Sequence, residues 1–375
     1  MPPPGRTPRL DLRFFFGQGW PYLLVPFIPL AIVLDEAGAG DALVFASSAL
    51  GIIPTAALMG RATEELASRS GPGIGGLLNV TFGNAPELII ALFALGEGLH
   101  EVVKATLIGS IIGNILLVLG ASMLVGGWGR EHQDFSATSA SVQTSMLLAA
   151  TAAFAMPAVF ELVEGKGLPA VGPELVEFDS TIEVLSGLIA GLLILIYVAG
   201  LYFSLRTHRD VFNPPYEQEG TWGWSVRTSV VMLAIAGVAV GVMSEVLVGS
   251  IGAASESLGL SEFFIGAIVV AIVGNAAEHW VAVLVARKNK MDLSINIAIG
   301  SGAQVALFVA PVLVLAGFFI GPAPMPLVFN GFEIGALILA VLIANYVSHE
   351  GRSTWFEGVQ LLAVYVMLAI VFGFA

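Results

Sequence analysis

A five-residue motif occurs twice in this chain, each time inside a hydrophobic stretch. Residues 83–87 read Gly-Asn-Ala-Pro-Glu, and residues 274–278 read Gly-Asn-Ala-Ala-Glu. An apolar run and then a Gly-Ser pair follow each copy, at 109–110 and at 300–301. The offset between the copies is 191 residues at both places (275 − 84 and 301 − 110). Each copy places a carboxylate within an apolar segment, and an acidic residue inside a membrane span marks a functional site by default.

The composition indicates a chain that lives in a membrane. Of its 375 residues, 57% are hydrophobic and 11% are charged, whereas soluble domains average about 25% charged residues. The mean hydropathy is +0.89, and apolar runs of roughly 20 residues recur along the chain. The absence of cysteine excludes disulfides and thiolate metal sites. The net charge of −13 argues against a nucleic-acid partner.

We therefore predict an all-α integral membrane protein with eleven transmembrane helices. The expected spans lie near 20–34, 42–60, 75–96, 102–126, 137–157, 182–204, 226–248, 262–286, 293–319, 327–346 and 355–374. With a cytoplasmic N-terminus, Lys104 and Lys166 fall outside and the other 13 of the 15 Lys and Arg residues fall inside. This asymmetry supports the count, the orientation and an outer C-terminus. A prokaryotic plasma (inner) membrane is the expected location.

The two motif copies must run through the membrane in opposite directions. Glu87 lies in the third span and Glu278 in the eighth, so an odd number of spans separates them. Inverted repeats of this kind are a hallmark of secondary transporters, whose site lies near the midplane between the repeats. We expect one N-terminal helix and two inverted-topology five-helix repeats, divided as 1–40 (cytoplasmic N-terminus and first helix), 41–205 (first repeat), 206–225 (cytoplasmic linker) and 226–375 (second repeat).

Within each copy, the amide and the carboxylate are three residues apart, which places Asn84 with Glu87, and Asn275 with Glu278, on one helix face. A proline lacks the backbone N–H and clashes with the preceding turn. The first copy should therefore break or kink its helix, which would expose carbonyl oxygens to a cavity. Because the second copy has alanine at that position, its break is less assured.

The expected ligands are hard oxygen donors: two carboxylates, two amide oxygens and freed carbonyls. Ca²⁺ takes about 6–8 oxygen ligands in flexible geometry, and a divalent ion would neutralise both glutamates. Without it, desolvation and like-charge repulsion together favour protonation of the pair. The pair can thus hold the metal or protons, which is the rule of a proton–cation antiporter. Ca²⁺ is the expected transported substrate, H⁺ the counter-ion, and no cofactor is expected.

Other polar residues recur at matched positions in both copies. Ser110 and Ser301 each follow their glutamate by 23 residues, with Asn114 and Gln304 close behind. Upstream, Glu64 aligns with Glu245, near opposite membrane faces. We predict that all six line the access path or transfer protons and cations. Helix–helix hydrogen bonding would be the alternative role for the serines and amides, and solvation at a span end the alternative for the two upstream glutamates.

These motifs resemble the calcium/proton antiporter (CAX) family of the calcium/cation exchanger superfamily. The resemblance rests on GLLNVTFGNAPELIIALFAL at 76–95, GNAAEHWVAV at 274–283, and the segments GSIIGNILLVLG at 109–120 and SINIAIGSGAQVALFVAP at 294–311. It implies eleven spans and Ca²⁺ bound between Glu87 and Glu278, helped by Asn84, Asn275 and backbone carbonyls. Many relatives carry an acidic segment between the sixth and seventh spans and hydroxyls near 302–303, and this chain departs from both patterns.

Three alternatives differ in class. A Na⁺/Ca²⁺ exchanger-like cation antiporter of the same superfamily usually carries a Gly-Thr-Ser-x-Pro-Glu type of signature, and Asn-Ala here removes the hydroxyls that help to hold Na⁺. A channel would not need inverted repeats around paired carboxylates. An intramembrane zinc protease would need His-Glu-x-x-His, and His349-Glu350 lacks the second histidine, so no enzymatic activity is expected. Selectivity against Mn²⁺ or Cd²⁺, ion stoichiometry and oligomeric state stay open.

Overall fold

The structure is a computed structural model that describes residues 19–70, 75, 77, 78, 81–172, 178–207 and 223–375. The expected cytoplasmic N-terminus up to residue 18 and most of the expected linker 206–225 lie outside the described residues. The matched segment at 76–95 is described except at positions 76, 79 and 80.

Helices account for nearly all of the regular structure in the described residues. In chain order the elements are η1 (Trp20–Leu24), α2 (Phe27–Glu36), α3 (Asp41–Arg69), α5 (Ala85–Gly96), α6 (His100–Ile112), η2 (Gly113–Val118), α7 (Leu119–Gly127), β1 (Gln133–Asp134), α8 (Ala137–Val163), α9 (Ser180–Tyr202), η3 (Phe203–Thr207), α11 (Val226–Leu258), α12 (Glu262–Phe264), η4 (Ile265–Val270), α13 (Ala271–Arg287), α14 (Met291–Gln304), η5 (Val305–Val309), α15 (Ala310–Ala316), α16 (Gly331–Ser348), β2 (Arg352–Ser353) and α17 (Trp355–Gly373).

Within the described part of the chain, nine continuous helical stretches are long and apolar enough to cross a membrane. Three of them contain a π-helical segment in mid-course, namely η2, η4 and η5. An all-α integral membrane fold is therefore confirmed. The count of eleven spans stays a prediction, because α2 and α5 are only 10 and 12 residues long. The domain boundaries and the inverted repeat also stay predictions.

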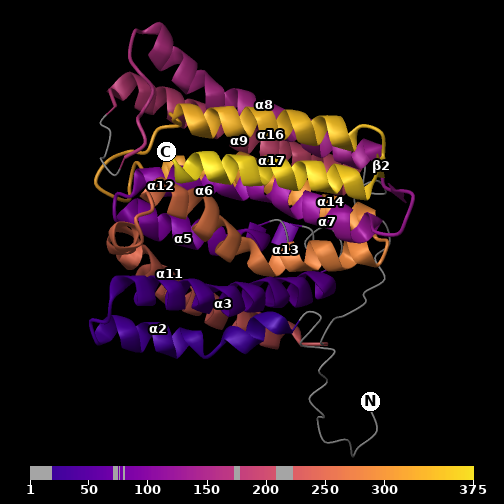
Figure 1. Cartoon of the computed structure of the whole chain (residues 1–375), viewed down its shortest axis with the longest axis horizontal. Helices are drawn as coiled ribbons and strands as arrows, with labels where there is room; N and C mark the ends of the chain where they lie inside the picture. The colour runs from indigo at the N-terminus through magenta and orange to yellow at the C-terminus, as the bar shows by residue number, and fades with distance from the viewer. Residues whose placement is uncertain (1–18, 71–74, 76, 79–80, 173–177, 208–222) are drawn as a thin grey trace, which may run out of the picture.

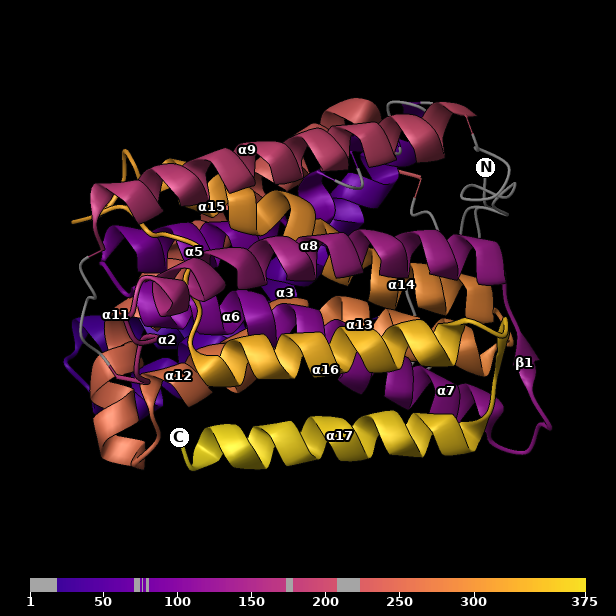
Figure 2. The same cartoon turned by 90° about the horizontal axis from the view of Figure 1, so that it is seen from above.

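The helices lie side by side along one common direction (Figures 1 and 2). The helical stretches 100–127 and 291–316 are the most buried, which places them at the centre of the bundle. The helices α3 and α11 pack along each other, and α2 packs on α3. The chain's C-terminal end lies at the opposite end of the bundle from β1 and β2.

A small antiparallel sheet joins two turns at one end of the bundle. Its strands β1 and β2 pair Gln133 with Ser353 and Asp134 with Arg352. The Gln133 side chain also donates to the Ala286 carbonyl oxygen (3.0 Å), at the end of α13. We call this end the basic face, because its turns and helix ends carry Arg130, Arg287, Lys288, Lys290 and Arg352. By the distribution of positive charge it is the face that we expect to be cytoplasmic.

The helix α3 continues nine residues past the expected span end at residue 60. An ion-pair network stabilises this extension: Arg61 contacts Glu64 (3.2 Å) and Glu65 (3.1 Å), three and four residues further along the same helix. The Glu65 side chain is fully buried and accepts from the Trp224 backbone N–H (3.0 Å). Mutual neutralisation of these charges explains how the helix continues.

Candidate metal and proton site

The first motif copy interrupts its helix. Residues 81–83 are helical, Asn84 adopts a turn conformation (φ −98°, ψ 19°), and α5 begins at Ala85. The proline Pro86 then occupies the first turn of α5, where its missing N–H would have no intrahelical partner anyway. The second copy lies within the unbroken helix α13. The expected break in the first copy is thus present, and alanine at 277 leaves the second helix continuous.

The two glutamates each lie against the glycine that opens the other motif copy. The position that a Cβ atom would occupy on Gly83 is 3.7 Å from Glu278 Oε1, and the same position on Gly274 is 3.7 Å from Glu87 Cγ. The carboxylates interact electrostatically with each other. Glu87 is 5% exposed, and its Oε2 atom is buried without a hydrogen-bond partner among the described residues. Glu278 is half-buried.

The amides and serines also pair crosswise between the two copies. Asn84 Oδ1 accepts a hydrogen bond from Ser301 (3.0 Å). Asn275 Nδ2 donates to Ser110 Oγ (3.3 Å) and to the Ala271 carbonyl oxygen (3.0 Å). Both asparagines and both serines are buried, with exposures between 1% and 6%. Each asparagine therefore meets the serine of the opposite copy, which the sequence alone did not reveal.

Around the first asparagine the polar contacts extend further. Asn84 Nδ2 donates to Gln304 Oε1 (2.6 Å), and the Ser301 hydroxyl also lies 3.4 Å from Glu278 Oε2. The structure thus gathers these four predicted residues into one polar cluster. Asn114 is buried against Gly302, with 3.8 Å between its Cβ atom and the Cβ position of that glycine, and its Nδ2 atom has no partner within the described chain.

The two upstream glutamates lie outside this cluster. Glu64 on α3 is exposed and pairs with Arg61, although it still interacts electrostatically with Glu278. Glu245 on α11 is exposed as well. Their predicted place on the access path stays a prediction.

A second buried charged group lies near the end of the bundle opposite the basic face, and sequence reasoning missed it. Lys104 of α6 is 8% exposed and donates to the Val328 carbonyl oxygen (2.8 Å). It interacts electrostatically with Glu101 on its own helix and with Glu333 at the start of α16. Glu333 belongs to a capping box with Asn330. The three-residue spacing of Glu101 and Lys104 was the available signal, whereas the contact with Glu333 depends on tertiary structure.

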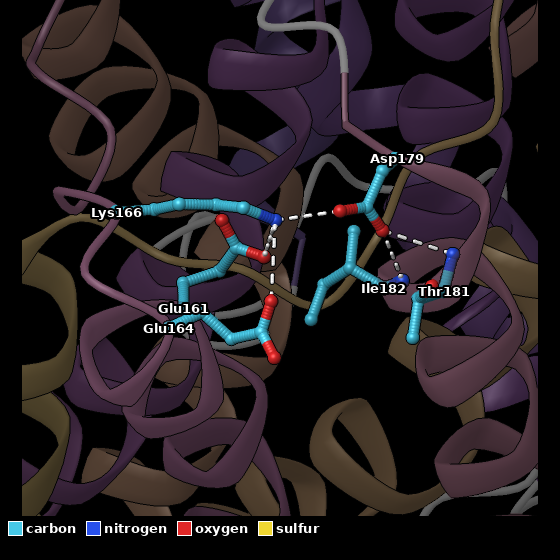
Figure 3. Close-up of polar contacts among 6 residues, drawn as sticks. All are labelled: Glu161, Glu164, Lys166, Asp179, Thr181 and Ile182. Atoms are coloured by element: carbon cyan, nitrogen blue, oxygen red, sulfur yellow. Dashed lines mark hydrogen bonds and ion pairs between the residues drawn. The ribbon is translucent and has the colours of Figure 1, made fainter.

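On the same side, three acidic residues surround Lys166 in the turn between α8 and α9. Its ammonium group contacts Asp179 (2.5 Å), Glu161 (3.4 Å) and Glu164 (4.0 Å) (Figure 3). The hydrogen bond from Lys166 lowers the pKa of Asp179, and the same bond raises the pKa of Lys166. Because the side chains of Lys166 and Asp179 are 41% and 47% exposed, their ion pair contributes little to holding the turn.

The central cluster has the donor set that a hard cation requires. No group of three or more histidines, aspartates and glutamates able to hold a metal occurs among the described residues. A cation between Glu87 and Glu278 would instead draw on two carboxylates, with amide, hydroxyl and carbonyl oxygens completing its shell.

Comparison with known proteins identifies the family of this chain. Residues 41–206 and 228–374 match the sodium/calcium exchanger protein family. A Ca(2+)/H(+) antiporter of Synechocystis sp. is 44% identical, over 94% of this chain and 96% of its own length. The Ca(2+)/H(+) antiporter ChaA of Bacillus subtilis is 45% identical, over 96% of this chain and 99% of its own length. The solved structure of native YfkE is 42% identical with a TM-score of 0.79, and the match covers 95% of this chain and 100% of YfkE.

The chain therefore belongs to the sodium/calcium exchanger protein family, and within it to the calcium/proton antiporter (CAX) group that its motifs resemble. This is a family of membrane transporters rather than of enzymes.

Proposed function

We propose that this protein exchanges Ca²⁺ for H⁺ across a membrane by alternating access. Glu87 and Glu278 bind either the metal or protons, and Asn84 and Asn275 contribute further oxygen ligands to the metal. The observation that carries this proposal is the crosswise placement of the two carboxylates, each against the glycine of the opposite motif copy. The relatives support the identity of the exchanged ions, because two curated relatives that are 44% and 45% identical are named Ca(2+)/H(+) antiporters.

Electrostatics turns this placement into an exchange rule. Two carboxylates that repel each other in a buried site are costly unless a cation or protons neutralise them. A bound divalent cation neutralises both charges, and release of the cation leaves two charges that protons then neutralise. A pair of glutamates with neither metal nor protons is unfavourable, and so is a pair that holds both at once. Movement of Ca²⁺ therefore couples to movement of H⁺.

The asparagines favour H⁺ over Na⁺ as the counter-ion. Asn84 is engaged by Ser301 and Gln304, and Asn275 by Ser110, so these amides are held by hydrogen bonds across the two copies. Neither motif supplies a Thr or Ser hydroxyl at this place, which a Na⁺ site of the exchanger type would use. A Na⁺/Ca²⁺ exchanger-like antiporter remains the second candidate, and the family name that the chain matches includes it.

We assign the remaining polar residues to the access paths. Ser301 contacts Glu278, whereas Ser110 and Gln304 contact the two motif asparagines and Asn114 lies against Gly302. In this proposal Glu64 and Glu245, which lie outside the cluster, line the path nearer the membrane faces. The bacterial relatives and the excess of Lys and Arg on one side are consistent with a prokaryotic plasma membrane, with that side in the cytoplasm.

The decisive experiment measures ⁴⁵Ca²⁺ uptake into proteoliposomes with a pH gradient and no Na⁺. We expect uptake by the wild type, with a loss of at least about 100-fold in Glu87→Gln and in Glu278→Gln, because either change removes half of the exchangeable charge. Glu97→Gln, an exposed glutamate at the end of α5, is the matched control and should transport normally. Robust exchange by both site variants would refute the mechanism, and uptake that requires a Na⁺ gradient would favour the second candidate.

A further inference from the structure

One face of α14 carries a row of residues that runs from the basic face to the proposed site. Asp292, Asn296, Gly300 and Gln304 are spaced four residues apart, so successive members are neighbours in a row that turns gradually around the helix. Each is exposed or half-buried, whereas the intervening residues Ile295, Ile299 and Ala303 are buried. At a rise of 1.5 Å per residue the row is about 18 Å long. Such a row ends at Gln304, which is hydrogen-bonded to Asn84.

The helix α8 supplies polar partners along the same row. Gln143 Nε2 donates to Asn296 Oδ1 (2.6 Å), and the Ser139 hydroxyl donates to the same oxygen (3.1 Å). At the basic face, Asp292 Oδ1 accepts from the Ser136 backbone N–H (2.5 Å). The two helices therefore present polar groups to each other from the membrane face inwards. Hydrogen bonding between helices would explain this pattern if every group were satisfied.

One group in the row is not satisfied. Gln143 Oε1 is buried and has no hydrogen-bond partner among the described residues. It lies 3.4 Å from the Cβ position of Gly300, the residue that precedes Ser301, and only atoms of Gln143 come within 4 Å of that position in the described part of the chain. A buried amide oxygen without a partner is costly in a membrane unless water reaches it. The Gln143 amide fills the space beside Gly300, which is itself only half-buried, so a water molecule at this point would supply the missing partner.

The equivalent row in the first motif copy is closed. The positions 191 residues earlier are Glu101, Ala105, Gly109 and Gly113, and the last three are buried. The Cβ position of Gly109 is far closer to the Ala267 carbonyl oxygen than van der Waals contact allows, so the backbones of α6 and η4 are in direct contact. Gly300 has no such contact among the described residues. The two copies thus differ in one respect: the row facing the basic end is open, and its counterpart facing the other end is sealed.

The row on α14 also has a definite inner end. Phe308 of η5, four residues beyond Gln304, stacks on Tyr197 of α9 with ring centroids 5.1 Å apart. Tyr197 is 6% exposed. The polar positions therefore lead to the cluster of Asn84, Ser301 and Glu278, and an aromatic pair blocks the way beyond it.

We propose that Gln143 and Asn296, together with Ser139, line a hydrated groove through which ions pass between the basic face and Glu278. The identity of those ions rests on the proposed function, whereas the groove itself rests on the row, the unsatisfied amide oxygen and the sealed counterpart. Gln143 and Asn296 touch neither carboxylate, so they act by keeping water in the path.

The natural absence of cysteine allows a direct test, because every introduced thiol is the only one. Single variants Gln143→Cys and Asn296→Cys in proteoliposomes are treated with a membrane-impermeant methanethiosulfonate reagent from each side. Thr144→Cys is the matched control, since Thr144 neighbours Gln143 but is fully buried and donates to Asn345 of α16. We expect both groove variants to react from the basic-face side at least tenfold faster than the control and tenfold faster than from the other side.

Equal rates for Gln143→Cys and the control, or faster reaction from the opposite side, would overturn the groove, and Asn296→Cys decides the outcome if the first variant fails to fold. Transport supplies a second readout. Modification of Gln143→Cys should lower Ca²⁺/H⁺ exchange at least tenfold, whereas the same reagent should leave the wild type unchanged. If the wild type shows no exchange, the proposed function fails, while the labelling result still decides whether the groove exists.

Discussion

The two motif copies hold the same side chains on different backbones. In the first copy the helix is interrupted at Asn84, so Glu87 lies in the first turn of α5. In the second copy Glu278 lies in the middle of the unbroken helix α13. A helix N-terminus stabilises negative charge through its free N–H groups, and the middle of a helix does not. Glu278 receives the Ser301 hydroxyl instead. The pair is thus chemically matched but electrostatically unequal.

This comparison teaches that the two motif copies contact each other at equivalent residues. Each glutamate lies against the other copy's glycine, and each asparagine contacts the other copy's serine. A change in one copy should therefore be felt at the partner residue in the other. Paired substitutions at equivalent positions test how far the equivalence extends.

Exchanging the two motif sequences should have the largest effect. Ala277→Pro places proline inside α13, where it removes a helical hydrogen bond and clashes with the preceding turn, so we expect a loss of about 3 kcal/mol or more. Pro86→Ala should cost only about 0.4–1 kcal/mol, because proline already suits the start of α5. Thermal unfolding in detergent measures both. Equal losses of stability in the two variants would contradict the idea that proline suits the interrupted helix and not the continuous one.

The equivalent glycines Gly109 and Gly300 should respond with opposite signs. Gly109→Ala forces a methyl group onto the Ala267 carbonyl and should destabilise by about 1–3 kcal/mol or more. Gly300→Ala meets only the flexible Gln143 amide at 3.4 Å, and alanine favours the helix by up to about 1 kcal/mol. The same unfolding assay compares them. A destabilised Gly300→Ala would contradict an open row on α14.

The two serines should differ by a smaller amount. Ser301→Ala removes contacts to Asn84 and Glu278, and a loss of about 0.5–1.5 kcal/mol corresponds to a three- to about tenfold decrease in exchange rate. Ser110 only accepts from Asn275, which also donates to the Ala271 carbonyl, so Ser110→Ala should lower the rate less. Initial rates of Ca²⁺/H⁺ exchange in proteoliposomes measure both variants. A larger decrease in rate for Ser110→Ala than for Ser301→Ala would contradict this prediction.

The smallest effect is expected outside both copies, at the exposed contact between Lys166 and Asp179. The lowered pKa of Asp179 means that its contribution is present above about pH 3.9 and is lost as the pH falls through the lowered value. The raised pKa of Lys166 means that its contribution is present below about pH 10.4 and is lost as the pH rises through the raised value. Lys166→Met should therefore leave Ca²⁺/H⁺ exchange at neutral pH unchanged. Thermal unfolding of the variant and the wild type should differ by the same small amount at every pH between about 3.9 and 10.4.

Much of the fold followed from local pattern. Apolar runs predicted the long helices, and Gly83 with Pro86 predicted the interruption, because both signals depend on neighbouring residues only. The helix α3 continues nine residues past the expected span end, since Arg61 is neutralised by glutamates that become neighbours only in a helix. The π-helical segments left no sequence signal that we recognised.

For the candidate site, the repeat identified the residues but not their partners. Asn84 and Ser301 are 217 residues apart, and their contact depends on how the two halves fold together. Gln143 and Asn296 were missed for the same reason. Each looks like an isolated polar residue on an apolar helix until α8 and α14 are placed side by side.

The seam between Gly109 and Ala267 consists of main chain on both sides. Among the described residues, the atoms nearest the Gly109 Cβ position are main-chain atoms of Ala267, which cannot rotate aside as a side chain can. We therefore expect that end of the transporter to open only when whole helices separate, which would make uncoupled leakage rare and the energy stored in the proton gradient hard to dissipate.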